Sequence, residues 1–484
     1  MARKGSEKRR TGCVTCKKRR VKCDETHPTC LRCQQGRRQC AYSEPPIGCF
    51  SWQHLLLPKP SIPATPSREL SVSTARSLDY FRYVVAPRLG GMTDTTFWTT
   101  TVMQLATTEN AAVQGILAVT LLDEDFKPSW KPVDNEAALK HYNQAMKMVA
   151  SQQLSTASVL VMTLLFTCIE FLRGNEKAAI LHCRHGALLS HSPEEHADDI
   201  TAMVRQLSIF PFFFSSGDFP APAPFNQPTL FETSAQASSS MDELMGQSIR
   251  LVRSFDSFRL GPEGVTVPVE TSAKQLSLLR SLKLWRNAYD DLARTGTSID
   301  QKARVLMQMQ YHVCWIWTCI ALQRNETASD SFQVNFSHIV EIARRTIKMH
   351  MCEQPWKFTF SMGMSPLLHF VVLKCRHLPL RLEALQLLRS LGRRRESLWD
   401  APAMCKIGEV IVEREHGPRY MLDMEMGEWD YPAEEARVRD SYVDNDAILG
   451  HDAEGNEVVR RQMHLFILEG GDVVKKSAWI ELAN

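Results

Sequence analysis

The chain has 484 residues, of which 44% are hydrophobic and 23% are charged, and its formal net charge is +3. A chain of this length is too long to fold around one ordinary hydrophobic core, so we predict about three domains. No apolar run reaches the roughly 18 residues that a membrane span requires. The first ten residues, MARKGSEKRR, are charged where a secretory signal would be apolar, so we expect a protein of reducing compartments whose 14 cysteines are metal ligands or free thiols rather than disulfides.

Positive charge is concentrated at the N-terminal end of the sequence. Residues 1–44 hold 13 Lys and Arg against 4 Asp and Glu, whereas the other 440 residues hold 44 basic and 50 acidic side chains. A basic end on a mildly acidic body predicts a polyanionic partner bound at that end. The leading tail, residues 1–12, is expected to be disordered and to provide phosphate contacts, a nuclear-import signal or both.

Six cysteines follow with the spacing C-x2-C-x6-C-x6-C-x2-C-x6-C, and they are Cys13, Cys16, Cys23, Cys30, Cys33 and Cys40. The second triplet repeats the first 17 residues later, so residues 13–40 are an internal duplication. Structural zinc takes four tetrahedral thiolates, and six thiolates satisfy two zinc ions if two of them bridge, a role that suits the equivalent Cys13 and Cys30. Metal binding must supply the folding energy of so short a segment. A disulfide framework is the rival interpretation, and the lack of a secretory signal disfavours it.

The two halves of the duplication differ in charge. Between Cys16 and Cys23 the sequence is KKRRVK, and the equivalent window after Cys33 is QQGRRQ. The richer first half is predicted to place a short helix in the major groove, with Lys18 and Lys22 on one side of the helix and Arg19 and Arg20 on neighbouring faces. Arginine or lysine donating to guanine O6 and N7 is the commonest base-specific contact. The second half is expected to contact the DNA backbone.

The segment GCVTCKKRRVKCDETHPTCLRCQQGRRQC, including Pro28 in the loop between the halves, resembles the fungal binuclear zinc-cluster, Zn(2)-Cys(6), transcription regulators along its whole length. The resemblance implies a nuclear, DNA-binding transcription regulator that reads G/C-rich, CGG-like elements, often for a metabolic or secondary-metabolite pathway. It implies that one zinc ion is held by Cys13, Cys16, Cys23 and Cys30, and the second by Cys30, Cys33, Cys40 and Cys13. It places base contacts on Arg19 and Arg20. We expect phosphate contacts from the other basic residues of the segment, which are Lys17, Lys18, Lys22, Arg32, Arg37 and Arg38.

Residues 45–69 contain six prolines and predict an extended, semi-stiff linker. Many regulators of the resembled class have a leucine heptad coiled coil here, but this sequence has no sustained a/d pattern. Dimerisation is therefore open: the protein binds as a monomer or dimerises through its body. Cys49, in this segment, is expected to be a free thiol.

From residue 70 to about 416, apolar residues recur three and four positions apart, which predicts a large all-α body. Residues 156–174 are apolar nearly all round and end at Gly174, as is typical of a buried central helix; Glu170 in its apolar run argues against a membrane span. A break at 208–240, rich in Phe, Pro and Ser, predicts a loop between two helical halves. Short stretches of the body resemble the helical regulatory region that follows the cluster in many fungal regulators.

From residue 417 to 484 the pattern changes. The stretch NEVVRRQMHLFILEGGDVV alternates weakly around a Gly-Gly pair and predicts a few strands. Residues 421–435 contain six acids and no base, a composition of activation segments, although we favour a structured surface connection. The predicted fold class is mainly α, with a zinc-organised N-terminal module and minor β content near the C-terminus.

Two rival classes of function are an enzyme with an accessory zinc module and a zinc-organised protein adaptor. The sequence has no G-x-S-x-G, P-loop, H-E-x-x-H or G-x-G-x-x-G motif, so we assign no catalytic residue and expect no enzyme; the KKRRVK run argues against the adaptor. The expected partners are double-stranded DNA and the transcription machinery, with no membrane.

Other candidate metal or redox residues are expected to be ordinary core side chains. A third metal site at His182, Cys183 and His185, near His191 and His196, is disfavoured because side chains one and three positions apart on a helix need not converge on one ion. The scattered cysteines are expected to be core thiols, and they are Cys168, Cys314, Cys319, Cys352, Cys375 and Cys405.

Overall fold

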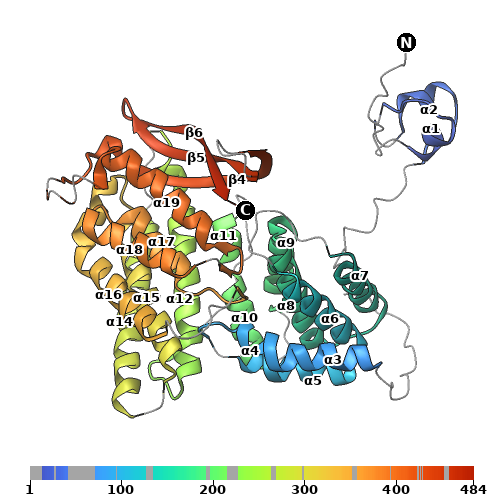
Figure 1. Ribbon diagram of the computed structural model, residues 1–484, viewed down its shortest axis with the longest axis horizontal. Helices are drawn as coiled ribbons and strands as arrows, with labels where there is room; N and C mark the ends of the chain where they lie inside the picture. The colour runs from blue at the N-terminus through green and yellow to red at the C-terminus, as the bar shows by residue number, and fades with distance from the viewer. Residues whose placement is uncertain are drawn as a thin grey trace. The chain divides into compact units, whose positions relative to one another are not determined.

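The computed structural model describes residues 13–24, 26, 29–41, 71–93, 95–126, 135–191, 197–214, 227–262, 269–296, 299–350, 357–392, 394–421, 425, 427, 429–451 and 457–483. They belong to two compact units, Met1–Lys59 and Pro60–Asn484. Helices dominate the large unit, two short helices lie in the small cysteine-rich unit, and the long strands lie near the C-terminus (Figure 1), which confirms the predicted fold class. The predicted basic tail and proline-rich linker, with Pro28, Cys49 and Cys352, lie outside the described residues.

The small unit is built around cysteines. Its two short helices, α1 (Val14–Lys18) and α2 (Leu31–Gln35), each begin directly after a cysteine. Its interior consists of Cys13, Cys16, Cys30 and Cys33, with three partly buried side chains packed against them, Val21, Cys23 and Cys40. The described residues thus form no ordinary hydrophobic core here, as the sequence predicts.

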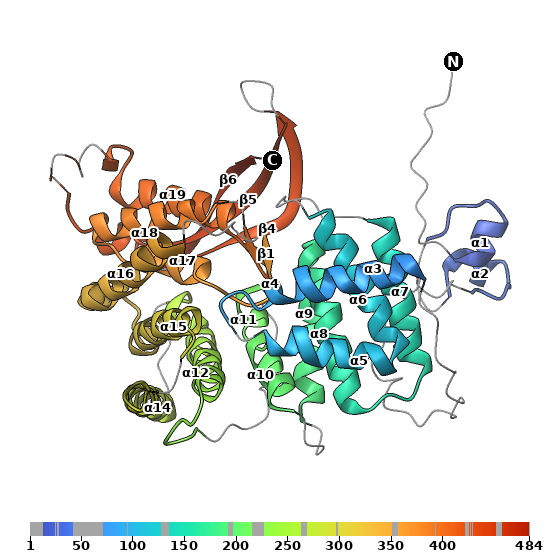
Figure 2. The same cartoon turned by 60° about the horizontal axis from the view of Figure 1, so that its bottom comes forward.

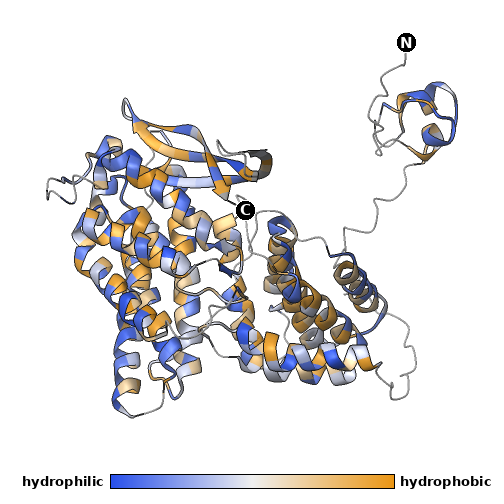
Figure 3. Cartoon of the chain, in the orientation of Figure 1, coloured by the Kyte–Doolittle hydropathy of each residue, from blue (hydrophilic) through white to orange (hydrophobic). Residues whose placement is uncertain are grey.

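The large unit begins with a group of helices centred on α8 (Thr156–Arg173) (Figures 1 and 2). Residues 159–172 of α8 are all buried, and the helix packs against α6, α7, α9 and α10. Its apolar ribbon is orange in Figure 3. The other elements of this group are α3 (Val72–Tyr80), η2 (Phe81–Val85), α4 (Ala86–Leu89), η3 (Phe97–Thr101), α5 (Val102–Thr108), α6 (Asn110–Glu124), α7 (Glu136–Ser151), α9 (Glu176–Leu189), α10 (Asp198–Leu207) and α11 (Phe210–Phe214).

Helix α8 confirms the predicted buried helix with a glycine stop. Its C-cap, Gly174, has φ 69°, the left-handed conformation in which glycine carries no Cβ penalty. By length and composition α8 is the one helix in the described ranges that is apolar enough to cross a membrane, and 78% of its apolar window is buried inside the protein. A core helix has these properties.

A second group of helices follows, and its members pack against one another (Figure 2). The predicted break at 208–240 is shorter than expected among the described residues, because α11 lies within it and the 21-residue α12 begins at Ser234, behind a Thr233 side-chain cap. The elements are α12 (Ser234–Ser254), α13 (Asp256–Arg259), α14 (Val269–Arg294), α15 (Gln301–Ile320), η4 (Glu326–Phe332), α16 (Gln333–His350), α17 (Ser365–Lys374), α18 (Leu378–Ser390) and α19 (Ala401–His416).

Two sheets complete the large unit. A small one, not predicted, joins β1 (Phe358–Thr359), β2 (Arg395–Glu396) and β3 (Trp399–Asp400). The predicted C-terminal strands form an antiparallel sheet of β4 (Val438–His451), β5 (Glu457–Glu469) and β6 (Asp472–Ala483) in that order.

The C-terminal sheet is shaped by a tight turn and an alternating pattern. Gly470 and Gly471, with φ 62° and 94°, form the predicted turn between β5 and β6. Alternate β5 residues, Met463, Leu465 and Ile467, face α19 and pack with Ile411. The sheet therefore lies against α19, as Figure 1 shows.

Buried ion pairs attach the first strand of this sheet to the helices. The Glu415 carboxylate at the end of α19 pairs with Arg376, 3.1 Å away, and with Arg381, 2.6 Å away. Glu415 also accepts a hydrogen bond of 2.7 Å from the backbone N–H of Val438, and Arg376 donates to the Val438 carbonyl at 3.0 Å. The start of β4 is thus held by charged groups that are themselves fully buried.

Candidate metal centre and nucleic-acid interface

The six N-terminal cysteines converge into two overlapping groups of four. Ligand atoms within each group lie within 4.8 Å of one another, and the two groups are Cys13, Cys16, Cys23 and Cys30, and Cys13, Cys30, Cys33 and Cys40. Cys13 and Cys30 belong to both groups. These groups are the same as the two ligand sets that the family resemblance implies, and the two shared cysteines are the ones that the duplicated spacing suggests as bridges.

The sulfur spacing fits tetrahedral zinc. Zinc–sulfur bonds of about 2.3 Å place the sulfurs of one tetrahedron about 3.8 Å apart. The Sγ atoms of Cys13 and Cys30 lie 3.7 Å apart, and the pairs Cys13–Cys33 and Cys16–Cys30 have the same separation. Two zinc ions, when bound, would hold the six thiolates as cross-links and so fold the segment.

The electrostatics of the cluster favour a cation at its centre. Burial raises the pKa of the Cys16 thiol to about 12 and also raises the pKa of Cys30. Buried thiolates therefore require a compensating charge, and zinc supplies it. Hydrogen bonds to sulfur help as well: Cys16 N–H donates to the Cys13 sulfur at 3.3 Å.

The duplication in the sequence is repeated in the local structure. The Cys13 N–H donates to the Cys23 sulfur at 3.4 Å, and the equivalent Cys30 N–H donates to the Cys40 sulfur at the same distance. The halves are also joined end to end, since Val14 N–H donates to the Ala41 carbonyl at 2.7 Å. Each half thus presents its helix in an equivalent setting.

Asp24 fixes the second helix, a role that the sequence interpretation missed. Cys30, the N-cap of α2, provides no side-chain cap. Instead the Asp24 carboxylate accepts hydrogen bonds from the N–H groups of Leu31 at 2.9 Å and Arg32 at 3.3 Å. These bonds, with one from Thr26, hold the pKa of Asp24 well below its usual range. Two features of the sequence could have indicated this role: an acid directly follows the third cysteine, and the predicted start of the second helix has no residue able to cap it.

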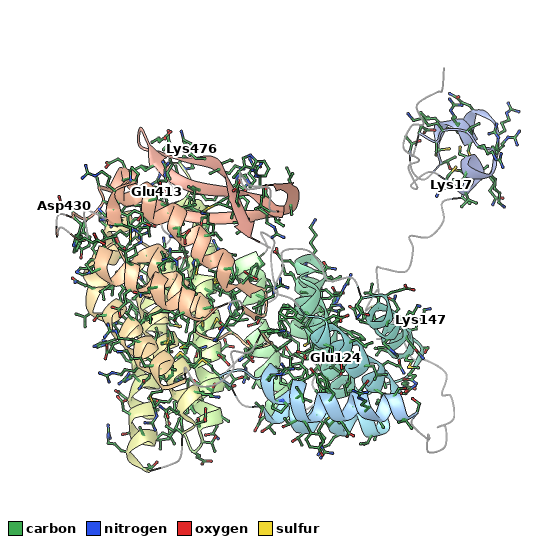
Figure 4. All side chains as sticks on the ribbon, viewed as in Figure 1. Lys17, Glu124, Lys147, Glu413, Asp430 and Lys476 are labelled. Atoms are coloured by element: carbon green, nitrogen blue, oxygen red, sulfur yellow. The ribbon has the colours of Figure 1, made fainter. Side chains whose placement is uncertain are left out.

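The basic residues surround the cluster but do not share one helix. All eight predicted contact residues are exposed, and Figure 4 shows side chains, Lys17 among them, extending outward from the small unit. Helix α1 ends at Lys18, and Arg19 is its C-cap. The predicted helical face shared by Lys18 and Lys22 is therefore wrong: Lys22 lies beyond the helix.

The chain turns at Arg20, which explains the early end of α1. Arg20 has φ 57°, in the left-handed region, so the helix cannot continue through it. Of the basic residues in the first half, Lys17 and Lys18 lie on the helix, whereas Arg20 and Lys22 lie on the segment that follows. In the second half Arg32 lies on α2, and Arg37 and Arg38 follow it.

Among the other candidate residues that the structure describes, His182 has a structural partner. His182 is buried in α9, where its Nε2 pairs with the Tyr142 hydroxyl at 2.9 Å. Within the described ranges the groups able to hold a metal are the two cysteine quartets. The thiols predicted to lie in the core are buried at Cys168, Cys314, Cys375 and Cys405 and partly buried at Cys319.

The acidic segment near residue 430 is attached to the large unit where it is described. Glu434 accepts hydrogen bonds from the N–H groups of Glu326 and Thr327, both at 3.0 Å, and pairs with Arg439 at 2.7 Å. Trp429 packs edge-on against His377. These contacts favour the predicted structured connection over an exposed activation segment.

Comparison with known proteins places the small unit in a family. Residues 11–47 match the family model of the fungal Zn(2)-Cys(6) binuclear cluster domain. The chain is 27% identical over 217 residues to the aspercryptin biosynthesis cluster-specific transcription regulator atnN of Emericella nidulans, which covers 37% of this chain and 34% of the relative. It is 27% identical over 153 residues to the transcriptional regulatory protein moc3 of Schizosaccharomyces pombe, and this alignment covers 30% of this chain and 27% of the relative.

A higher identity extends over a short stretch of the chain. The lysine biosynthesis regulatory protein LYS14 of Saccharomyces cerevisiae is 61% identical over 33 residues, which are 7% of this chain and 4% of the relative. The chain thus matches about a third or less of the length of these relatives. No solved structure matches it.

Proposed function

The N-terminal unit of this chain is a fungal Zn(2)-Cys(6) binuclear cluster domain, the zinc-binding, DNA-binding module of a family of transcription regulators, and from that premise we propose that the chain is a nuclear, sequence-specific regulator that recognises G/C-rich, CGG-like elements. The observation that carries the proposal is the pair of cysteine quartets sharing Cys13 and Cys30, surrounded by exposed basic side chains.

The placement of the basic residues supports a division of roles. Arg19 and Arg20 lie directly after the last residue of α1, where the backbone turns at Arg20. We assign guanine contacts to these two side chains, because a guanidinium donates two parallel hydrogen bonds to O6 and N7. Phosphate contacts are assigned to residues that flank this turn or lie in the second half: Lys17, Lys18, Lys22, Arg32, Arg37 and Arg38.

The helical body is the proposed regulatory region. Its alignment with relatives extends over 217 residues in one case, well beyond the cluster. The names of two relatives refer to the biosynthesis of aspercryptin and of lysine, which supports control of a metabolic or secondary-metabolite pathway here. Contacts with the transcription machinery belong to the same proposal, and the oligomeric state is left to experiment.

Selection of bound DNA from a random double-stranded pool tests the proposal, with the full zinc-loaded chain as bait. We expect enrichment of an element containing a G/C-rich triplet, and its number of copies and their spacing will give the stoichiometry. Six phosphate contacts per cluster predict a slope of about −5 for log affinity against log salt. An enzyme or adaptor with an accessory zinc module would enrich no element and show no steep salt dependence, and that result would refute the proposal.

A further inference from the structure

The outer edge of β6 is a long, regular strand edge that has no partner strand. On its other side β6 pairs with β5 in an unbroken register, from Val458 opposite Ala483 to Glu469 opposite Asp472. Within the described ranges, no backbone hydrogen bond joins the outer edge of β6 to another element. Such an edge presents a row of backbone donors and acceptors that can pair with a further strand. Figure 4 labels Lys476, which lies on β6.

The opposite edge of the sheet, at β4, is protected against further pairing. Arg376 donates to the Val438 carbonyl, and Glu415 accepts from the Val438 N–H. Lys374 donates to the Arg439 carbonyl at 2.8 Å. Two register shifts also interrupt the pairing of β4 with β5. Occupied backbone groups and bulges both prevent a strand from adding to an edge, and the described part of β6 has neither feature.

The side chains of β6 alternate between a buried and an exposed face of the sheet. Ile480 and Leu482 are buried in the cluster that packs against α19. Because successive side chains of a strand point to opposite faces, Lys475, Trp479 and Glu481 lie on the other face, and all three are exposed. Trp479 is 54% exposed, and tryptophan is enriched in protein interfaces. This face of β6 therefore has the composition of a contact surface.

A second copy of β6 complements the first in charge. A two-fold axis perpendicular to the sheet pairs the strand with its own copy in the antiparallel direction, and residues on the same face then meet. With Ala478 on the axis, Lys475 of each copy lies opposite Glu481 of the partner copy. Opposite charges directly across two strands stabilise their pairing, and symmetry provides this contact twice.

The charge pattern selects this register over its neighbours. An axis at Lys475 or at Lys476 would set that lysine against itself, and like charges directly opposite destabilise a strand pair. An axis at Ser477 would place Lys475 opposite Trp479, without an acid. Only the axis at Ala478 joins acid to base while most of the strand remains paired.

The two charged side chains are available for a further contact. Glu481 pairs with Arg460 of β5 at 2.6 Å, and its side chain is still 47% exposed. A carboxylate accepts several hydrogen bonds, so Glu481 has capacity for a second cation. The Lys475 amine lies 3.3 Å from the Tyr442 hydroxyl at an exposed position, and its flexible chain is free to turn toward the strand edge.

We propose that two copies of this chain associate through β6, antiparallel and with Ala478 on the two-fold axis. The three strands of each copy then form one continuous sheet. The two Trp479 side chains become diagonal neighbours on the exposed face, a separation that aromatic side chains bridge. This association requires neither DNA nor the zinc cluster and is therefore independent of the proposed function.

Sedimentation equilibrium of the full zinc-loaded chain without DNA, over about 1–100 µM, measures the association. We expect a reversible monomer–dimer equilibrium with Kd of about 10 µM, because β6 offers fewer residues than the roughly 20–30 per side of a standard interface. A chain that remains monomeric at about 100 µM would overturn the proposal and would leave the proposed DNA binding unaffected.

Charge reversal tests the register. Lys475→Glu and Glu481→Lys each set like charges against each other at both contacts, so each variant alone should show a dimer Kd raised about 10-fold or more. In an equimolar mixture of the two variants both contacts again join opposite charges, and a mixed dimer should form with a Kd within about 5-fold of the unchanged chain. A mixture that associates no better than its two components would contradict the proposal.

Lys476→Glu is the matched control, because it makes the same change of charge at the neighbouring position. Lys476 pairs with Glu469 of its own chain at 3.0 Å, and in the proposed register it lies opposite Ile480 rather than an acid. Its dimer Kd should stay within about 2-fold of the unchanged chain, and circular dichroism checks that every variant is folded. Equal weakening by Lys475→Glu and Lys476→Glu would show that net charge alone governs association, against the proposal.

Discussion

Arg20 and Arg37 adopt the same left-handed backbone conformation, with φ of 57° and 45°, at equivalent positions of the two halves of the cysteine cluster. Each follows the end of a five-residue helix, behind Arg19 in one half and Gly36 in the other. The conformation costs an ordinary residue about 1 kcal/mol relative to glycine. Arg20 therefore has a strained backbone at the position to which we assign a guanine contact. The strain and the guanine contact can be tested separately.

Replacement of Arg20 by glycine and by alanine separates the backbone from the side chain. Both variants lack the guanidinium and should lose preference for the selected element to the same extent. Arg20→Gly removes the strain, so its cluster should be more stable than that of Arg20→Ala by about 1 kcal/mol. Chelator competition would show this as a roughly 5-fold higher zinc affinity; equal affinities would mean that the left-handed turn is not formed in solution.

Arg20 and Lys22 are expected to act differently on DNA. Arg20→Ala should reduce binding to the selected element by about 1–3 kcal/mol and change binding to random DNA little. Lys22→Ala should weaken binding to both DNAs alike. It should also make the slope of log affinity against log salt shallower by about 0.9, the contribution of one phosphate contact. Fluorescence anisotropy with the two DNAs over a salt series measures both effects. Equal loss of specificity in the two variants would refute the assignment of roles.

The shared position of Cys30 predicts that one substitution releases two metal ions. Because Cys30 belongs to both cysteine quartets, Cys30→Ser should lower the zinc content of the purified chain from two ions to about none. Cys319→Ser, at a partly buried body cysteine outside the cluster, is the control and should retain both ions. Elemental analysis gives the count, and retention of two zinc ions by Cys30→Ser would exclude the bridging arrangement.

The large unit offers a test of its buried charges at Glu415. Burial raises the pKa of this carboxyl, but Arg376 and Arg381 lower it to about 2 overall. The folded-state pKa lies below the unfolded value of about 4.3, so the stabilisation is complete above that value and is lost as the pH falls toward 2. Glu415→Gln should cost about 3–5 kcal/mol at pH 7, because it leaves two buried guanidiniums without their carboxylate.

A neighbouring glutamate provides the control for this prediction. Glu409 on the same helix pairs with Arg389 at the surface, so Glu409→Gln should cost less than about 1 kcal/mol. Urea unfolding at pH 7 and at pH 3 measures both variants, and the difference between Glu415→Gln and the unchanged chain should shrink at the lower pH. Similar costs for the two variants would show that the buried pairs do not stabilise the attachment of β4.

The metal ligands were predictable because their chemistry is local. The repeated spacing of six thiols marks them as metal ligands, whereas their division into two sets came from the family resemblance. The Gly-Gly turn at 470–471 and the glycine stop at 174 have the same local character. The end of α1 was not predictable in this way, because the first half has Arg19 where the second half has Gly36. No helix-stop residue marks Arg20, and Lys22 was therefore placed on the helix by mistake.

Ion pairs between residues far apart in the sequence could not be predicted from the sequence. Arg376, Arg381 and Glu415 are separated along the chain, and no periodic pattern relates them before the helices pack. The contact between Trp429 and His377 has the same origin, since these side chains meet only when the large unit has folded. The short sheet at Phe358, Arg395 and Trp399 likewise depends on strands of two residues each, below the length at which alternation is detectable.

The central claim is that zinc folds the cysteine cluster into the surface that binds DNA. Its most direct test is the affinity of the full chain for its selected element before chelation, after chelation and after zinc is restored. The account predicts a loss of at least about 100-fold on chelation and full recovery with zinc, while the helical circular dichroism of the large unit is unchanged. A chelated chain that binds the element as tightly as the zinc-loaded chain would contradict the account.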